Sequence, residues 1–231
     1  MPHSPSEGVI RFAVAHTTRA LEPRVLGEAA GVLGAWREIL AHLRVLGQDP
    51  ARYEGLGFGN VSIRVAPLGG APQGARPFLV TGTQTGALAH TTLREFCLVE
   101  RWDIPRNAVT SRGEVAPSSE SLTHAALYDC SPAVRVVLHA HAPAIWRRAR
   151  ALGLPVSDPG AANGTPAMAF EMQRLYREGV FASLRVAAMG GHEDGIVAFG
   201  ATAEEAGGAL VRELARALAN APSPARPEGR S

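Results

Sequence analysis

The stretch "VVLHAHAPAIW", residues 136–146, joins an apolar segment to a pair of histidines. Its apolar start, without polar interruption, is typical of a strand that is buried on both faces of a sheet. The run ends in His139 and His141, separated by Ala140. Alternate residues of a strand point to one face, about 7 Å apart along the chain, so the two imidazoles project together. Either this is a polar strand end near solvent, or the pair binds one metal ion at about 2.0–2.1 Å.

Around this stretch, predicted helices alternate with predicted strands. Apolar residues at helical or alternating spacing define these elements. The predicted strands are residues 60–65, 77–81, 97–103, 108–113, 134–140, 184–189 and 195–200. The predicted helices are residues 26–46, 91–96, 118–130, 143–152, 165–179 and 202–221. This order predicts an α/β fold, a mixed sheet covered by helices. We expect one domain over residues 18–221, with flexible tails at 1–17 and 222–231.

Composition excludes several classes of protein. The chain has 231 residues, of which 46% are hydrophobic and 19% charged, so we expect a substantial core. A net charge of +2 does not indicate a nucleic-acid-binding surface. No apolar run approaches the roughly 20 residues of a membrane span. The N-terminus lacks signal-peptide order and two cysteines make no disulfide framework, which favours a cytoplasmic protein. All 23 basic residues are arginines, which excludes catalysis through a lysine Schiff base.

Two further residues could complete a metal site. A catalytic zinc ion commonly has three protein ligands and one open position. His192 lies in "MGGHEDG", between two predicted strands, and Glu120 lies in "APSSESLTH", at a predicted helix start. A carboxylate in a first turn is also favoured by the helix dipole, which is the alternative explanation for Glu120. Three histidines and a glutamate at strand ends and loops around one sheet together favour a site. The remaining histidines, His3, His16, His42, His90 and His124, are better explained as surface or structural residues.

Three glycine- and hydroxyl-rich motifs suit an anion. They are "GFGNVS" at residues 57–62, "TGTQTG" at 81–86 and "PSSE" at 117–120. The last opens a helix, where free backbone N–H groups attract phosphate or carboxylate. Each motif alone is an ordinary turn.

The order of these motifs resembles the class II aldolase/adducin family, over residues 36–200. That family includes sugar-phosphate aldolases, a pentulose-phosphate 4-epimerase and a thiosugar-phosphate dehydratase. The resemblance implies a single α/β/α domain with a central, largely antiparallel sheet. It also implies a homotetramer with active sites at subunit interfaces, acting on a small-molecule substrate.

The resemblance also implies roles for particular residues. His139, His141 and His192 match the zinc histidines, and Glu120 matches the acidic residue that ligates zinc at rest and acts as acid and base in turnover. The positions that hold substrate phosphate are matched by Asn60, Thr85, Gly86, Ser118 and Ser119. Zinc suits the nitrogen and carboxylate ligands, and Mn²⁺, Co²⁺ or Fe²⁺ are alternatives.

The sequence departs from the family's pattern at two places. The aldolases place a tyrosine some twenty residues after the histidine pair, whereas residues 147–171 contain none and Tyr176 is the nearest. The threonine–glycine motif is also lengthened to "TGTQTG", so the recognised anion is a phosphate or a carboxylate.

We therefore expect a metal-dependent lyase of the aldolase type, acting on a hydroxy-carbonyl substrate through a metal-stabilised enediolate. A dehydratase, epimerase or decarboxylase on the same scaffold is the alternative. A non-catalytic, adducin-like binding protein fits less well, because that branch does not need the metal ligands. A hydrolase on a (β/α)₈ barrel is disfavoured, because such barrels need about 250 residues and the sequence shows no βα repeat.

Overall fold

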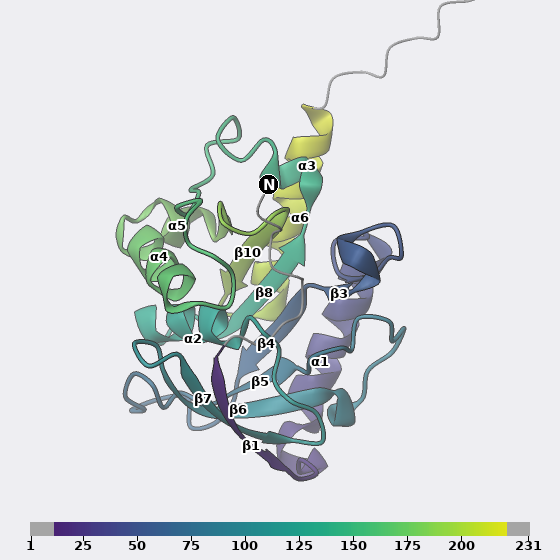
Figure 1. Ribbon diagram of the computed structural model, residues 1–231, viewed down its shortest axis with the longest axis vertical. Helices are drawn as coiled ribbons and strands as arrows, with labels where there is room; N and C mark the ends of the chain where they lie inside the picture. Colours follow the sequence, from purple (N-terminus) through teal and green to yellow (C-terminus); the bar gives the residue numbers. More distant parts are fainter. Residues whose placement is uncertain (1–11, 221–231) are drawn as a thin grey trace, which may run out of the picture.

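The computed structural model describes residues 12–220 as a sheet between two layers of helices (Figure 1). The sheet has eight strands in the order β1-β7-β6-β5-β4-β8-β10-β9. In chain order they are β1 (Ala13–Thr18), β4 (Asn60–Arg64), β5 (Phe78–Thr81), β6 (Phe96–Asp103), β7 (Ala108–Gly113), β8 (Val136–His141), β9 (Val186–Ala188) and β10 (Gly195–Gly200). Among the described strands β1 and β7 are parallel and every other sheet pair is antiparallel, as expected.

Helices cover both faces of this sheet. The longer ones are α1 (Pro23–His42), α2 (Ser121–Cys130), α4 (Pro166–Arg177) and α6 (Ala203–Ala219). Along β8, Val136 and Leu138 join the core that includes α1 and α6, while Val137 joins the core that includes α2 and α4. Alternate side chains of β8 therefore pack into hydrophobic cores on opposite faces of the sheet. The predicted α/β/α sandwich is confirmed.

Short elements complete the described chain. They are the small pair β2 (Gly47–Gln48) and β3 (Gly57–Phe58), the 3₁₀ turns η1 (Tyr53–Gly55) and η2 (Leu93–Glu95), and the helices α3 (Pro143–Trp146) and α5 (Val180–Leu184). Side chains cap the starts of η2 and α4. Thr92 and Glu95 form a capping box at η2, and the Thr165 hydroxyl caps α4 ahead of Pro166. At α6 the Thr202 hydroxyl accepts from the Glu205 N–H, but the Glu205 carboxylate accepts from Ala201 rather than from Thr202.

Several predicted boundaries are wrong. Helix α1 begins at Pro23 instead of residue 26 and ends at His42 instead of residue 46. Helix α2 begins at Ser121, two to three residues later than predicted, and α3 stops at Trp146 instead of residue 152. In α1 the packed side chains include Leu33 and Leu40, whereas the apolar Val32 and Ile39 are exposed.

Strand β1 lies in a segment for which the sequence predicted no element. It runs along the sheet edge beside β7, and five of its six residues are exposed, so it carries no alternating apolar pattern. The domain limits 18–221 stay a prediction, and most of both predicted tails lies outside the described residues. Among residues 12–220, no helix has the length and apolar character that crossing a membrane requires.

Candidate metal centre

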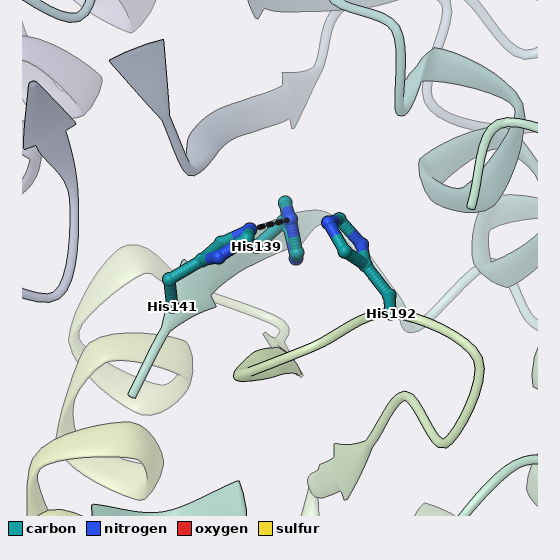
Figure 2. Close-up of side chains that lie close together, drawn as sticks. All are labelled: His139, His141 and His192. Atoms are coloured by element: carbon teal, nitrogen blue, oxygen red, sulfur yellow. Dashed lines mark hydrogen bonds between the residues drawn. The ribbon is translucent and has the colours of Figure 1, made fainter. Parts of the chain in front are cut away.

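The histidine pair lies at the end of β8, an interior strand of the sheet. Strand β8 lies between β4 and β10, and all six of its residues are buried. His139 and His141 leave β8 on the same face, as predicted, with their Nε2 atoms 3.2 Å apart (Figure 2). Ala140 points to the opposite face, where it packs in the core that includes α1 and α6. The pair is therefore held by the backbone of a strand that is hydrogen-bonded on both sides.

His192 reaches the pair from the loop between β9 and β10. Its ring centroid lies 5.0 Å from that of His139 and 4.7 Å from that of His141, and its side chain is buried. Figure 2 shows the three imidazoles facing a common point from two separate segments. Gly191 allows this approach, because a Cβ there would overlap the carbonyl of Ala161. One nitrogen from each histidine lies within 4.8 Å of the others, a group that could hold a metal ion.

The hydrogen bonding of His139 suits metal binding. Its Nδ1 lies 3.2 Å from the carbonyl oxygen of Ile196. A carbonyl only accepts, so Nδ1 carries the proton and donates, and Nε2 presents a lone pair toward His141. Histidine ligands of metals generally donate their second ring nitrogen in this way, which fixes both tautomer and ring orientation.

The spacing of the nitrogens also fits a metal ion. Two ligands at about 2.0–2.1 Å from a tetrahedral zinc ion lie about 3.3 Å from each other. The Nε2 atoms of His139 and His141 already have this separation, at 3.2 Å. The side chains of all three histidines are buried, in a place where charged imidazolium rings would repel one another. The donor set therefore suits a divalent cation bound by neutral imidazoles.

Glu120 lies at the edge of the histidine cluster. It is the residue before α2, is fully buried, and its Oε1 is 3.9 Å from Nδ1 of His192. The Thr123 hydroxyl donates to Oε2 over 2.6 Å and so holds the carboxylate from the first turn of α2. The Glu120 side chain makes no capping hydrogen bond to α2. The predicted glutamate and histidines thus converge in space.

The five residues predicted to bind an anion line one cavity of about 30 Å³. Asn60 begins β4, Thr85 and Gly86 follow β5, and Ser118 and Ser119 precede α2. Asn60 is directly opposite His139 in the sheet register, and Ser119 immediately precedes Glu120 in the chain, so the cavity adjoins the histidine cluster. The Asn60 Oδ1 atom is buried and has no hydrogen-bond partner among the described residues.

Arg37 supports the wall of this cavity, and the sequence patterns did not indicate it. Its guanidinium is buried and donates to the carbonyl oxygens of Thr85, Gly86 and Leu88, at 2.6, 3.2 and 2.6 Å. Gly86 must be glycine, because a Cβ would lie 2.5 Å from the Gly47 carbonyl oxygen. The "TGTQTG" loop is therefore fixed in place beside a buried positive charge.

The other described histidines have structural partners, as expected. His124 is fully buried, its Nδ1 is 2.6 Å from the Ser62 hydroxyl, and burial lowers its pKa to about 3. His90 pairs with Glu38, and His16 contacts the hydroxyl of Ser111. His42 bonds the backbone carbonyl of Glu38, and His3 lies outside the described residues. Cys97 is buried and Cys130 is half-buried; burial raises the pKa of their thiols to about 12 and about 11.

A second group that sequence patterns missed surrounds His141. The Tyr53 ring lies edge-on to the His141 ring, with centroids 4.6 Å apart, and its hydroxyl donates to Asp194 over 2.8 Å. Arg52 donates to the Tyr53 hydroxyl and to the His141 carbonyl. Tyr176, the tyrosine nearest the family's position, packs instead against Phe199. No pattern marks Arg52 or Tyr53, because both lie in an irregular segment between β2 and β3.

Several solved structures share this fold. An L-fuculose 1-phosphate aldolase superposes with a TM-score of 0.59 at 19% identity, covering 82% of each chain. YgbL from Escherichia coli, whose candidate activities are aldolase, epimerase or decarboxylase, has a TM-score of 0.56 at 17% identity, covering 87% of this chain and 93% of its own. An L-fuculose-1-phosphate aldolase from Thermus thermophilus has a TM-score of 0.52 at 21% identity, covering 84% and 93%. At these identities the likeness establishes the fold.

Sequence comparison establishes the family. No curated protein has a sequence that matches this chain. The model of the "Class II Aldolase and Adducin N-terminal domain" matches residues 38–217, which is most of the chain and contains every site residue that the sequence predicted. The chain therefore belongs to the class II aldolase and adducin family.

Proposed function

We propose that this protein is a metal-dependent lyase of the aldolase type that acts on a small hydroxy-carbonyl compound with an anionic group. One observation carries the proposal: three buried histidines and a buried glutamate converge from three segments beside a polar cavity. His139, His141 and His192 would hold a divalent cation, with zinc favoured and Mn²⁺, Co²⁺ or Fe²⁺ as alternatives. When bound, this cation would polarise the substrate carbonyl and stabilise the charge of an enediolate.

The chain's own residues would perform the remaining steps. Glu120 would take a proton from the substrate and return one, because its carboxylate is buried beside the cluster and its Oε2 is steadied by Thr123. It would also contact the cation when no substrate is present. Asn60, Ser118 and Ser119 would bind the anionic group through their amide and hydroxyls, at the wall formed by Thr85 and Gly86. The small cavity would exclude water from this end of the substrate.

A dehydratase, epimerase or decarboxylase on the same site is the second candidate, and one observation favours it. Tyr176 packs against Phe199, and residues 147–171 contain no tyrosine, so this chain does not supply the tyrosine of the family's aldolases at that position. A non-catalytic, adducin-like role is disfavoured, because the chain keeps the buried ligand cluster.

A substrate panel separates these candidates. The parent protein, loaded with Zn²⁺, is assayed with sugar phosphates and with small hydroxy acids for carbonyl fragments, loss of water, release of CO₂ and epimerised product. Carbon–carbon cleavage that disappears in Glu120→Gln and persists in Glu28→Gln supports an aldolase, since Glu28 is exposed on α1. Loss of water or CO₂ without cleavage supports the second candidate. Turnover that is unchanged in Glu120→Gln contradicts both.

We also propose a homotetramer with active sites at subunit interfaces and a cytoplasmic location. The family resemblance supports the assembly, and the cavity at the ends of the interior strands β4 and β5 gives a neighbouring subunit a place to add residues. Analytical ultracentrifugation measures the assembly directly. A monomer at the protein concentration of the activity assay would contradict the proposed tetramer. It would not contradict the proposed metal chemistry.

A further inference from the structure

Arg52 and Tyr53 contact His141 from a segment outside the ligand-bearing elements. The Arg52 Nη2 donates to the backbone carbonyl of His141 over 3.2 Å, and the edge of the Tyr53 ring meets the imidazole, with a centroid distance of 4.6 Å. The Arg52 guanidinium lies over the rings of both Tyr53 and Phe58, 4.9 and 4.4 Å from their centroids. These contacts hold the last residue of β8 from a segment that is not part of the eight-stranded sheet.

The same two residues reach the loop that carries His192. The Tyr53 hydroxyl donates to Oδ2 of Asp194 over 2.8 Å, while accepting from Arg52 over 2.8 Å. Asp194 is two residues beyond His192, and its side chain is buried. The backbone carbonyl of Asp194 also accepts from the N–H of Ala142, the residue after His141. A continuous set of hydrogen bonds therefore joins the two segments that supply ligands.

The backbone of this network is held in an unfavourable conformation. Tyr53 has a φ of 48° and Asp194 a φ of 60°, in the left-handed region that side-chain-bearing residues seldom occupy. Such conformations persist where surrounding contacts determine them, and here the contacts are those that join Tyr53 to Asp194. The backbone is therefore strained at both residues of the Tyr53–Asp194 hydrogen bond.

We infer that Arg52, Tyr53 and Asp194 form a positioning network that holds His141 and His192 at the separation a metal ion requires. This inference rests on the proposed function, because it presumes that the histidines bind a cation. The rings of His141 and His192 are 4.7 Å apart, yet they lie 51 positions apart in the chain, on a strand end and a loop. Hydrogen bonds beyond the ligands commonly tune affinity by 10- to 100-fold, because they set ligand orientation before the metal arrives.

Removal of one hydroxyl tests this network. Tyr53→Phe keeps the ring against His141 but deletes the donor to Asp194, whereas Tyr176→Phe deletes a hydroxyl that is remote from the cluster and serves as control. The metal-free proteins are titrated with Zn²⁺ in competition with a chromophoric chelator. We expect Tyr53→Phe to bind Zn²⁺ about 10-fold more weakly and Tyr176→Phe to bind it like the parent.

A spectroscopic measurement separates positioning from mere structural support. Co²⁺ loaded in place of Zn²⁺ reports ligand geometry through its visible absorption, which a change in fold stability alone does not alter. We expect an altered spectrum in Tyr53→Phe and a parental spectrum in Tyr176→Phe. Thermal unfolding of the metal-free variants confirms that both are folded at the temperature of the titration.

Arg52→Met provides a second variant if Tyr53→Phe does not fold. We expect it to weaken Zn²⁺ binding similarly, and we expect the double variant to lose less than the sum of the two single losses, because the two residues share the hydrogen bond at the Tyr53 hydroxyl. If the folded variants match the parent in both Zn²⁺ affinity and Co²⁺ spectrum, the inference is wrong. That result would not contradict the metal site itself. A parent protein that binds no Zn²⁺ overturns the proposed function itself.

Discussion

Asn60 lies directly opposite His139 in the antiparallel pair of β4 and β8. This register places the start of β4, which lines the cavity, beside β8, which carries two of the candidate ligands. The distance between Asn60 and His139 is thus set by backbone hydrogen bonds of the sheet, not by a loop. A substrate anchored in the cavity by its anionic group would present its other end to the histidine cluster at a constant distance.

The hydroxyls of the cavity are expected to determine anion affinity. Ser119→Ala removes one donor to a charged ligand, an interaction typically worth about 1.5–3 kcal/mol, so binding weakens about 10-fold or more. Calorimetric titration with inorganic phosphate and with glycolate measures the loss, and the probe that binds the parent more tightly identifies the preferred anion. Ser183→Ala, at a position on α5 remote from the cavity, should bind like the parent. Equal binding by the parent and Ser119→Ala would remove Ser119 from the site.

Gly86 is expected to tolerate no side chain. An added Cβ would lie 2.5 Å from the Gly47 carbonyl oxygen and 2.6 Å from the Gly57 Cα, both backbone atoms that cannot rotate away. Gly86→Ala should therefore lower the free energy of unfolding by about 1–3 kcal/mol. Gly208→Ala on α6 meets no atom within 4 Å and should leave stability unchanged or slightly higher. Urea unfolding measures both, and equal midpoints would contradict the packing described for this loop.

Glu120 is expected to contribute to turnover more than to folding. Glu120→Gln keeps the shape and the hydrogen bond from Thr123 but removes the base, so kcat should fall about 10²- to 10⁴-fold. Its circular dichroism and its thermal unfolding should stay close to those of the parent, because the side chain does not cap α2. A variant that unfolds at much lower temperature, with kcat intact when folded, would show that Glu120 is structural.

His124 is expected to make stability fall in acid. Burial lowers its pKa to about 3, while the unfolded chain titrates near 6.5. Below pH ~6.5 the unfolded state binds a proton that the folded state does not, so the free energy of unfolding falls toward pH 3, by up to about 1.4 kcal/mol per unit. His124→Asn replaces the Nδ1 contact with Ser62 by an amide that does not titrate.

Denaturant unfolding of both proteins between pH 7 and pH 4, with chelator present, isolates this contribution. Every other titratable group is the same in both proteins, so its contribution cancels in the difference. We expect a steeper loss of stability in the parent than in His124→Asn. Parallel curves would mean that the His124 ring takes up a proton in the folded state as easily as in the unfolded chain.

Much of the site could be predicted because strand geometry is local. The alternation of β8 placed His139 and His141 on one face, and the order of motifs along the chain matched Glu120 and His192 to them. Element boundaries were harder to predict. Exposed Val32 and Ile39 carry the same apolar signal as buried Leu33 and Leu40, and the edge strand β1 is exposed along most of its length. Burial, which decides these cases, depends on tertiary packing.

The residues that support the site could not be predicted for the same reason. Arg37 lies on a helix and Tyr53 in an irregular segment, and each acts through partners 48 to 141 positions away. Neither position has a spacing or a motif that sets it apart from a surface residue. Only the fold brings Arg37 under the "TGTQTG" loop and Tyr53 against His141.

The central claim is that His139, His141 and His192 bind one divalent metal ion, and elemental analysis of the purified protein tests it most directly. The protein is prepared without chelator, beside His139→Ala, His141→Ala and the control His90→Ala, whose imidazole is exposed and pairs with Glu38. We predict about one divalent metal per chain in the parent and in His90→Ala, and none in the two cluster variants. Full metal content in His139→Ala or His141→Ala, or a parent that carries none and takes up none on addition of Zn²⁺, would contradict the account.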